Sequence, residues 1–305
     1  MVRSALKKLL EKQHYAFIGD NSAIKICTWT KRSLLDEDVC YKEKFYNIKS
    51  HRCCQISTTI GYCQNRCILC WRPIEYTEGS KMKKYDSPKE LIDKAIQAQR
   101  KLLSGFGGNE KLNKKKFQEA QNPDQFAISL SGEPLLYPKL GKLIKEIKDR
   151  KATAYVVTNG LLPNKLKSLK PLPTNLYISI DAPNEELFKK IDQSKAKNAW
   201  KKLNKSLKIL SKLKTTTILR ITLIKGLNDI NPEQYAELIK KADPKFVEVK
   251  AYMWVGASQQ RLDIKNMPIH SEVKEFSKEI LKHLKNYKLK DEKKESRVIL
   301  LAKNQ

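Results

Sequence analysis

The stretch Cys63-Gln-Asn-Arg-Cys67-Ile-Leu-Cys70 carries three cysteines in the spacing C-x3-C-x2-C, shortly after an apolar segment that runs from Gln55 to Ile60. Three thiolates on so short a loop can bind three irons of a 4Fe-4S cube and leave the fourth iron open to a small molecule. The alternative is a zinc site, but zinc normally takes four protein ligands in a tetrahedron. The spacing therefore favours an iron–sulfur cluster with one open iron.

The other cysteines all precede this stretch. Twelve residues separate Cys27 from Cys40, and twelve more separate Cys40 from Cys53, so the regular spacing selects Cys53 rather than Cys54 as the third member. Three such cysteines suggest a second cube, again with one open iron. The alternative is that they are small buried hydrophobic residues. Because all seven cysteines crowd into one region, we expect metal chemistry in a reducing cytosol rather than disulfides.

The charge of the chain is strongly positive. Its 305 residues include 61 Lys and Arg against 33 Asp and Glu, which gives a formal charge of +28. Residues 189–214 hold ten lysines and a single acid, Asp192. These lysines are Lys189, Lys190, Lys195, Lys197, Lys201, Lys202, Lys205, Lys208, Lys212 and Lys214. A thermophile-like surface usually raises Glu together with Lys, which is not the case here. The excess favours binding to a polyanion, most commonly nucleic acid.

The rest of the chain alternates apolar runs of β type with stretches of helical spacing. The runs are Gln55–Ile60, Phe126–Leu130, Thr153–Val157, Asn175–Ile180, Thr216–Leu223 and Phe246–Tyr252, and the helical stretches include Lys139–Lys148, Asn184–Leu213 and Pro232–Ala242. Near-continuous apolar strands between helices indicate a parallel sheet that is buried on both faces. Six βα units predict an α/β fold, an open partial (βα)6 barrel.

The predicted domains follow from this pattern. Residues 1–54 form an N-terminal extension with the second cysteine set, and residues 55–305 form the barrel, which ends in an amphipathic helix at His270–Leu284 and a last strand at Arg297–Leu301. Residues 105–122, rich in glycine and lysine, are expected to be a mobile basic excursion, either a lid, an RNA-contacting loop or a plain surface loop. The chain lacks a signal-peptide core and any run of membrane-spanning length, so we expect a cytoplasmic protein without membrane contact.

Polar residues gather where successive barrel strands end, which is where the active site of such a barrel belongs. Glycine lets a ligand approach the backbone, carboxylates accept from an amine or ribose hydroxyls, and Asn or Arg can bind a carboxylate. Each turn alone is common, but their recurrence at successive strand ends predicts one binding site. The candidate cofactor-binding residues are Gly132, Glu133, Pro134, Thr158, Asn159, Ser179, Asp181, Arg220 and Thr222.

One lysine is a candidate for covalent chemistry. Lys42 lies two residues after Cys40 and close to the aromatic residues Tyr41, Phe45 and Tyr46. A lysine that is partly desolvated in such surroundings has a lowered pKa, and its free amine can condense with a carbonyl. In a chain this rich in lysine, a solvated charge is the more frequent role of any one lysine.

Taken together, these motifs resemble the stand-alone archaeal form of the tRNA 4-demethylwyosine synthases, which are radical S-adenosyl-L-methionine (SAM) enzymes. The most specific element is the pair of twelve-residue spacings ahead of the C-x3-C-x2-C motif, and Cys54 departs from the pattern. The resemblance covers almost the whole chain. It is carried by His51–Cys53, Cys63–Arg72, Ser129–Pro134, Thr158–Gly160, Leu176–Pro183, Arg220–Asn228 and Val249–Ala257.

The resemblance implies two 4Fe-4S clusters. The radical-SAM cluster would be held by Cys63, Cys67 and Cys70, and the auxiliary cluster by Cys27, Cys40 and Cys53. The implied reaction is that of a carbon–carbon lyase in wyosine biosynthesis. It joins N1-methylguanosine at position 37 of tRNA(Phe) with pyruvate to give 4-demethylwyosine, through a 5′-deoxyadenosyl radical from SAM.

In this family, a lysine that Lys42 matches is proposed to form a Schiff base with pyruvate. The competing account has pyruvate bound by the open iron of the auxiliary cluster. Trp71, Tyr252 and Trp254 are candidates either for stacking on the target base or for the core.

The resemblance also implies the molecules with which the protein interacts. The partners are the anticodon loop of tRNA(Phe), pyruvate and an external electron donor of ferredoxin or flavodoxin type, since no flavodoxin-like domain precedes the barrel in this sequence. We expect a monomer.

Two other functions compete with this interpretation. The closer one is that of another radical SAM enzyme that modifies RNA, a methyltransferase or methylthiotransferase. A rival from a different class is a non-catalytic, zinc-dependent RNA-binding protein.

Overall fold

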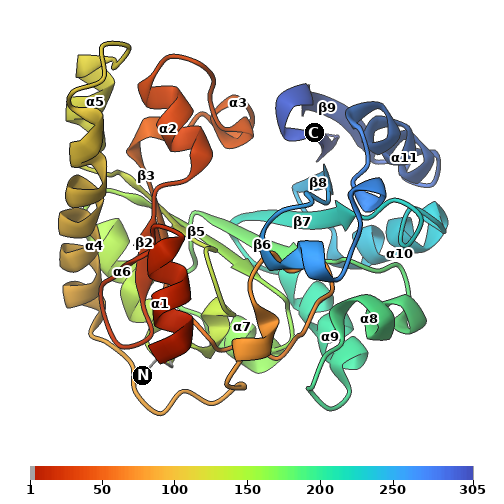
Figure 1. The fold of residues 1–305 in the computed structure, drawn as a ribbon. Coiled ribbons are helices and arrows are strands. Elements are labelled where there is room, and N and C mark those ends of the chain that lie inside the picture. Colours follow the sequence, from red (N-terminus) through yellow and green to blue (C-terminus); the bar gives the residue numbers. More distant parts are fainter. Residues whose placement is uncertain (1–3, 305) are drawn as a thin grey trace. The chain divides into compact units, whose positions relative to one another are not determined.

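The computed structural model describes residues 4–304 (Figure 1). These residues form two compact units. Unit 1 contains residues 4–63, Glu78–Val157 and Leu169–Thr174, and unit 2 contains Gln64–Thr77, Thr158–Ser168 and residues 175–304. The C-x3-C-x2-C stretch is divided between them, because Cys63 belongs to unit 1 and the two other cysteines to unit 2. The predicted boundary between residues 54 and 55 stays a prediction. Residues 1–3 of the extension lie outside the described residues.

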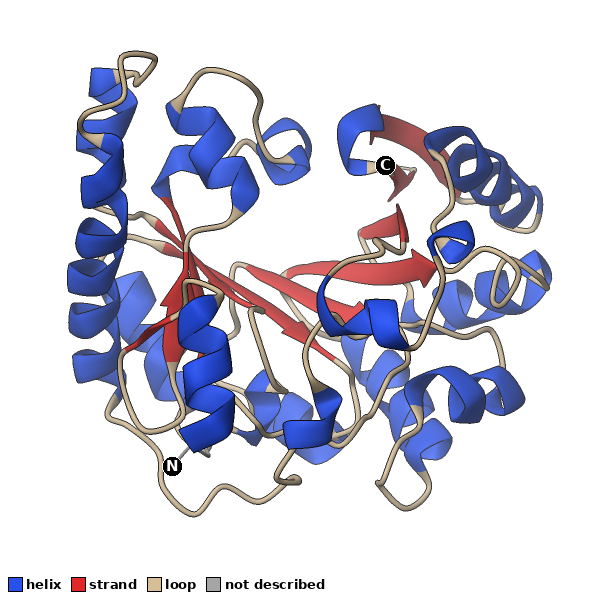
Figure 2. Ribbon diagram, in the orientation of Figure 1, coloured by secondary structure: helices blue, strands red, loops and turns tan. Residues whose placement is uncertain are grey.

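The sheet of unit 1 joins an antiparallel edge to a parallel centre (Figure 2). In spatial order its strands are β1 (Ala16–Phe17), β2 (Ala23–Lys25), β3 (Cys53–Ser57), β4 (Gln125–Ile128) and β5 (Thr153–Thr158). β3, β4 and β5 are parallel, and Ala127 lies between Gln55 and Tyr155 in the register. Every residue of β4 is buried, as expected for a parallel strand with both faces covered. The first three predicted apolar runs are therefore confirmed as strands, with small shifts at their ends.

The helices of unit 1 bury one apolar face each. They are α1 (Ser4–Lys12), α2 (Thr28–Leu34), α3 (Tyr41–Tyr46), α4 (Pro88–Leu103), α5 (Lys114–Ala120) and α6 (Leu140–Asp149). α6 shows why the sequence folds in this way, because Leu140, Leu143, Ile144 and Ile147 recur at helical spacing and are all buried. The predicted helix at 139–148 is thus confirmed.

The predicted excursion at 105–122 contains more structure than a loop, which corrects the expectation. Its second half forms α5, where the side chain of Asn113 accepts a hydrogen bond from the backbone N–H of Lys116 (3.0 Å) and so caps the helix. Ala120 packs in a small core with Leu34 and Leu103, which Phe117 extends. The sequence analysis predicted a loop because this segment is rich in lysine and glycine. The helix forms because its few apolar residues pack against the rest of unit 1.

The sheet of unit 2 has three parallel strands in its described part and an antiparallel edge. In spatial order its strands are β6 (Asn175–Ser179), β7 (Thr216–Leu223), β8 (Phe246–Ala251), β10 (Val298–Lys303) and β9 (Tyr287–Lys293). β10 confirms the predicted last strand and runs antiparallel to β8. The sequence did not predict β9, because an exposed edge strand can carry lysines and acids instead of an apolar run.

The helices of unit 2 follow its strands in the expected alternation. They are α7 (Pro163–Ser168), α8 (Glu185–Asp192), α9 (Ala199–Leu210), α10 (Pro232–Ala242) and α11 (His270–Lys282). The predicted helical stretch 184–213 is in fact two helices. The chain breaks between α8 and α9, where Gln193 and Asn198 take left-handed backbone angles (φ 43° and 53°) that a continuous helix does not allow.

None of the helices within residues 4–304 is both long enough and apolar enough to cross a membrane.

Candidate active site

The Gly-Glu-Pro turn of unit 1 packs against the segment that leads into Cys63. Gly132 has φ +76°, and a Cβ there would lie 1.9 Å from the carbonyl oxygen of Thr59, so only glycine fits. The N–H of Glu133 donates to the carbonyl of Tyr62 (2.9 Å). Glu133 and Pro134 are buried. The turn is therefore fixed to the backbone one residue before the first cysteine of the motif.

Unit 1 also brings together the starts of three elements that carry cysteines. Cys27 and Cys40 are the residues that precede α2 and α3, and Cys53 opens β3. Buried Ser50 links them, because its hydroxyl accepts from the N–H of Cys40 (2.8 Å) and its carbonyl accepts from the hydroxyl of Thr30 (2.9 Å) on α2. This serine holds the two helix starts near the strand start.

The Cys53 thiol is affected by burial and by the charged groups around it. Burial raises the pKa of the Cys53 thiol well above its usual range, the charges of Cys27 and Cys40 add to the rise, and the ammonium group of Lys42 opposes it. Within residues 4–304, no three His, Cys, Asp or Glu side chains are arranged around a single metal ion. A 4Fe-4S cube asks for a wider arrangement, because each thiolate binds a different iron. Three neighbouring thiols are a donor set that fits such a cube.

Cys54 differs sharply from Cys53. It is completely buried, and desolvation alone raises the pKa of its thiol. Successive side chains of a strand point to opposite faces of the sheet, so on β3 Cys54 points away from the face that Cys53 serves. Cys54 therefore belongs to the core, and the choice of Cys53 as the third member of the set stays a prediction.

Lys42 lies on α3 in the same part of unit 1. Its Nζ stands over the ring of Tyr155, 5.2 Å from the ring centroid, and Tyr155 is a buried residue of β5. On the same helix Tyr41 and Phe45 are buried and pack edge to face, with their ring centroids 5.5 Å apart. A strand of the sheet, β5, therefore supplies an aromatic ring next to the amine.

In unit 2, the C-terminal half of the cysteine loop is attached to the end of α8. The backbone N–H groups of Arg66 and Ile68 donate to the carbonyls of Asp192 (3.0 Å) and Ile191 (2.9 Å). The carboxylate of Asp192 accepts from the side-chain amide of Asn65 (2.9 Å) and from the thiol of Cys67 (3.3 Å). The single acid of the lysine-rich stretch thus has a defined place beside a candidate ligand.

The buried position of Asp192 affects its charge. Burial raises the pKa of this carboxyl well above its ordinary value, the charge of Asp181 adds to the rise, and the hydrogen bonds from Cys67 and Asn65 limit it. Its second oxygen is buried and has no hydrogen-bond partner within the described chain. A buried polar atom without a partner is costly and calls for an explanation.

The strand ends of unit 2 hold the other predicted cofactor-binding residues. The side-chain amide of Asn159 donates to that of Gln64 (3.2 Å), so the Thr-Asn-Gly turn also contacts the cysteine loop. The hydroxyl of buried Thr158 accepts from the N–H of Gly160 (3.1 Å) and shapes this turn. Ser179, half-buried, ends β6 beside Arg220 in the register.

Two further residues lie on neighbouring strand ends. Asp181 is buried, and its carboxylate accepts from the backbone N–H of Thr222 (3.3 Å). Burial raises the pKa of Asp181 to about 6, although bonding to Thr222 and the charge of Arg220 limit the rise. Arg220 is already paired, since its guanidinium donates to the fully buried Glu248 (2.8 Å) and stacks on the ring of Tyr177. Glu248 was not predicted, and it fixes the direction of the arginine.

Arg261 is the strongest contact that sequence reasoning missed. Its guanidinium donates to three carbonyl oxygens of the cysteine loop, those of Ile68, Cys70 and Arg72, and pairs with Glu75 (3.0 Å). The backbone of residues 256–257 also contacts the cysteine loop. The N–H of Ala257 donates to the carbonyl of Trp71 (2.9 Å), and a Cβ at Gly256 would lie 2.4 Å from that same oxygen. A C-terminal segment thus fastens the loop around Cys70.

We expect Arg261→Ala to loosen this loop. The planar guanidinium makes several bonds at fixed angles, so Arg261→Lys should restore only part of the effect. Backbone amides of residues 66–72 should then exchange with deuterium at least about tenfold faster, the factor that 1.4 kcal/mol of lost bonding gives. Exchange followed by mass spectrometry measures this. Arg297→Ala is the matched control, because that guanidinium binds the carbonyl of Pro268 (2.9 Å) away from the loop. Equal protection in both variants would contradict the role.

Tyr252 and Trp254, two of the candidates for stacking on the target base, both bond to neighbouring residues of the chain. Tyr252 is buried, and its hydroxyl bonds that of Ser258 (2.8 Å), which makes it a core residue rather than a stacking platform. Trp254 is half-buried, and its indole N–H donates to the carbonyl of Leu262 (2.9 Å).

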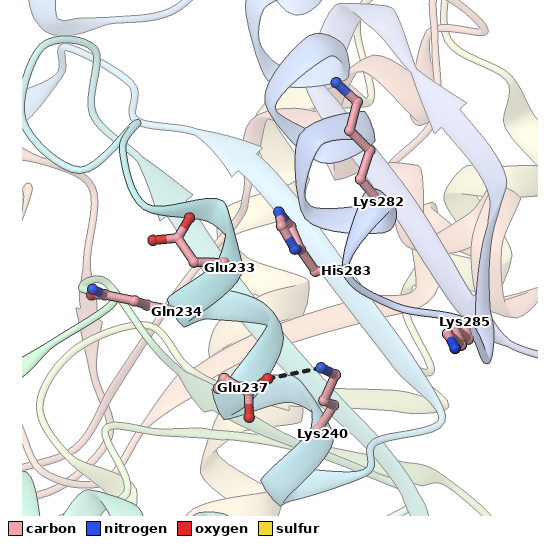
Figure 3. Close-up of a pocket in the computed structure, with 7 residues that line it drawn as sticks. All are labelled: Glu233, Gln234, Glu237, Lys240, Lys282, His283 and Lys285. Carbon is pink, nitrogen blue, oxygen red and sulfur yellow. Dashed lines mark hydrogen bonds and ion pairs between the residues drawn. The ribbon is translucent and has the colours of Figure 1, made fainter.

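A cleft of about 330 Å³ lies between α10 and α11 (Figure 3). None of the predicted site residues lines it. Its lining is Glu233, Gln234, Glu237, Lys240, Lys282, His283 and Lys285.

Comparison with known proteins agrees with this arrangement. Residues 57–239 match the family model of the radical SAM superfamily, and residues 241–303 match a model described as wyosine base formation. The chain is therefore a radical SAM protein, which uses SAM and an iron–sulfur cluster. The loop-fastening residues 256–261 lie in the second of these matches.

Individual relatives narrow the assignment. The S-adenosyl-L-methionine-dependent tRNA 4-demethylwyosine synthase of Pyrococcus horikoshii is 45% identical over 97% of this chain and 88% of that protein. The enzyme of the same name from Methanocaldococcus jannaschii is 39% identical over 99% of this chain and 96% of that protein. The chain belongs to the family of S-adenosyl-L-methionine-dependent tRNA 4-demethylwyosine synthases.

A solved structure supports the same family. The structure of TYW1 with a lysine-pyruvate adduct bound superposes with a TM-score of 0.90 at 36% identity, over 99% of this chain and 97% of that one. This similarity confirms the α/β fold with a partial (βα)6 barrel. It also favours the resemblance seen in the sequence over the rival classes of RNA-modifying enzyme and zinc-binding protein.

Proposed function

We propose that this chain makes 4-demethylwyosine from N1-methylguanosine at position 37 of tRNA(Phe) and pyruvate, the activity for which its relatives are named. The observation that carries the proposal is the position of Lys42 in unit 1. It stands on α3, which begins directly after Cys40, and its Nζ lies 5.2 Å from the centroid of the Tyr155 ring. A structural relative of 36% identity is described with a lysine-pyruvate adduct.

The two cysteine sets have separate parts in this proposal. Cys63, Cys67 and Cys70 would hold the radical-SAM cluster, and the trio in unit 1 would hold an auxiliary 4Fe-4S cluster. When bound, the first cluster supplies the electron that cleaves SAM to methionine and a 5′-deoxyadenosyl radical. The electron itself comes from an external donor of ferredoxin or flavodoxin type, and the protein works as a monomer.

The strand-end residues would bind and orient SAM. Arg220, held in place by Glu248, and Asn159, held by Gln64, are suited to a carboxylate, because each presents fixed N–H donors. Glu133 and Asp181 are suited to an amino group or to ribose hydroxyls. Their work is to hold the cofactor close to the methyl group of the substrate base and to keep water out.

Lys42 would bind pyruvate covalently. Its uncharged amine attacks C2 of pyruvate, and loss of one water molecule leaves an imine, which holds pyruvate in place. C1 then leaves as carbon dioxide or its equivalent, and C2 and C3 remain to close the new ring. The ring of Tyr155 beneath Nζ attracts the cationic form and restricts where the amine can point. A second account, with pyruvate bound by the open iron of the auxiliary cluster, uses the same part of unit 1.

The substrate base lies in a single-stranded loop, where it can be splayed out for recognition. The test is mass spectrometry of nucleosides from tRNA after anaerobic incubation with reconstituted protein, SAM, dithionite and pyruvate labelled at C2 and C3. We expect both labelled carbons in a tricyclic guanosine derivative, and only with tRNA that starts as N1-methylguanosine. Formation of 5′-deoxyadenosine without any labelled nucleoside would leave the cofactor assignment standing and overturn the substrate assignment.

A further inference from the structure

We propose that a stripe of lysines on α9 binds the phosphate backbone of the anticodon stem, the double-helical part of the tRNA next to the reacting base. The stripe consists of Lys201, Lys205 and Lys208 and continues into Lys212 just after the helix. The proposal rests on the proposed function, because it names the surface that holds the body of that substrate while the loop enters the site.

The stripe has a regular geometry. Leu203, Leu207 and Leu210 form the buried face of α9, whereas Lys201, Lys205 and Lys208 are exposed. At 3.6 residues per turn, these lysines fall within about 60° of one another, on the side opposite the leucines. From Lys201 to Lys208 the helix rises about 10 Å, at about 1.5 Å per residue. The result is a row of exposed lysines along one side of α9, of which Lys205 also donates to the side-chain oxygen of Asn164 (3.3 Å).

The charge of this surface is not balanced locally. Residues 193–217 contain no Asp or Glu, and none of the stripe lysines has a carboxylate partner within residues 4–304. The surface around the cleft in Figure 3 shows the opposite arrangement. There Lys240 pairs with Glu237 at 2.7 Å, a contact that Figure 3 draws. Lys282 pairs with Glu279, also at 2.7 Å. Unpaired lysines cost electrostatic repulsion, which a bound polyanion relieves.

The stripe begins beside the candidate site and leads away from it within unit 2. The N–H of Lys195, just before α9, donates to the carbonyl of Gln64 in the cysteine loop (2.9 Å). Trp200, in the first turn of α9, packs on Phe188 of α8, whose end carries Asp192 beside Cys67. A nucleic acid whose loop reaches the cluster can therefore lay its adjoining stem along α9.

The chemistry of the stripe fits a phosphate backbone better than a protein partner such as an acidic electron donor. Lysine is a flexible point charge that contacts phosphates without a fixed register. Protein interfaces, in contrast, are depleted in lysine and enclose an apolar centre. In the described part of the chain, α9 presents no large hydrophobic side chain with high exposure. The stripe offers charge alone, which double-helical RNA can use at every phosphate.

The test compares two triple variants with the same loss of charge. The first is Lys201→Gln, Lys205→Gln and Lys208→Gln, and the control, on α10 and α11, is Lys240→Gln, Lys278→Gln and Lys282→Gln. All six positions are exposed on helices, and glutamine has nearly the helix propensity of lysine. Binding of unmodified tRNA(Phe) transcript, and of its isolated anticodon stem-loop, is measured by fluorescence anisotropy over a range of salt concentrations.

We expect the α9 variant to reduce the slope of log K against log salt by about 2, since each lost phosphate contact contributes roughly 0.7 to 0.9. Its affinity should fall at least tenfold for both RNAs, while SAM cleavage and iron content stay unchanged. The control should bind as the unaltered chain does. Equal losses in both variants, or no loss in the first, would overturn the proposal. So would unchanged RNA binding together with slower reduction by a flavodoxin, which would assign the stripe to the electron donor.

These outcomes are independent of the proposed chemistry. If the unaltered protein binds tRNA with a salt dependence that α9 controls but forms no tricyclic nucleoside, the docking surface stands and the reaction assignment fails. If it forms the product and the α9 variant binds tRNA normally, the reaction stands and the docking surface fails.

Discussion

Replacing Lys42 by alanine is expected to reduce formation of the tricyclic nucleoside by about two orders of magnitude or more, the scale on which loss of a catalytic group acts. Cleavage of SAM and the iron content should not change. Lys42 is not a candidate ligand of either cluster. The measurement is nucleoside mass spectrometry together with 5′-deoxyadenosine release from the same reaction.

Two further variants sharpen this result. Lys42→Arg keeps a positive charge near Tyr155 but cannot form an imine, so it should be as inactive as the alanine variant. Lys44→Ala removes an exposed lysine from the same helix, α3, and should retain product formation. Borohydride added with pyruvate should fix the three-carbon unit to the peptide that contains Lys42. Full activity of Lys42→Arg would remove the Schiff base and leave only an electrostatic role.

The strands that could be predicted from the sequence are those with two buried faces. β6 is an example, because Leu176, Tyr177 and Ile178 are completely buried and follow one another without a charged residue. β9 escaped prediction because it lies at the sheet edge, where its lysines face solvent. The break between α8 and α9 was missed for a different reason. It depends on left-handed backbone angles at Gln193 and Asn198, which helical spacing does not reveal.

Some residues of the candidate site could be predicted from the sequence, and others could not. Gly132 and Asn159 could be found because each belongs to a short turn with its own sequence signal. Arg261 could not, since it lies 191 residues from Cys70 and its function depends on a fold that brings the two together. Asp192 gave a weak signal as the only acid among ten lysines, but its hydrogen bond to Cys67 is a tertiary contact. Local chemistry is visible in a sequence, whereas long-range support is not.

The second large effect is expected from the adjacent cysteines Cys53 and Cys54, each replaced by alanine. Cys53→Ala should lose about four irons and four sulfides per chain, one whole cube, because two remaining thiolates hold such a cluster poorly. Cys54→Ala should keep both clusters and lose only about 1 kcal/mol of stability, a typical cost of a truncated core side chain. Iron and sulfide analysis after anaerobic reconstitution checks both, and thermal unfolding checks the second. Loss of iron from Cys54→Ala alone would contradict the assignment.

This pair separates the two explanations that the sequence left open for the early cysteines. If they were only small hydrophobic residues, both variants would lose stability in proportion to burial and neither would lose iron. Strand alternation instead gives the neighbours different surroundings, since Cys53 faces the charges of Cys27, Cys40 and Lys42, and Cys54 experiences desolvation alone. We therefore expect Cys53→Ala to form no product yet still to cleave SAM, because Cys63, Cys67 and Cys70 are untouched. That result would place the auxiliary cluster on the side of pyruvate and Lys42.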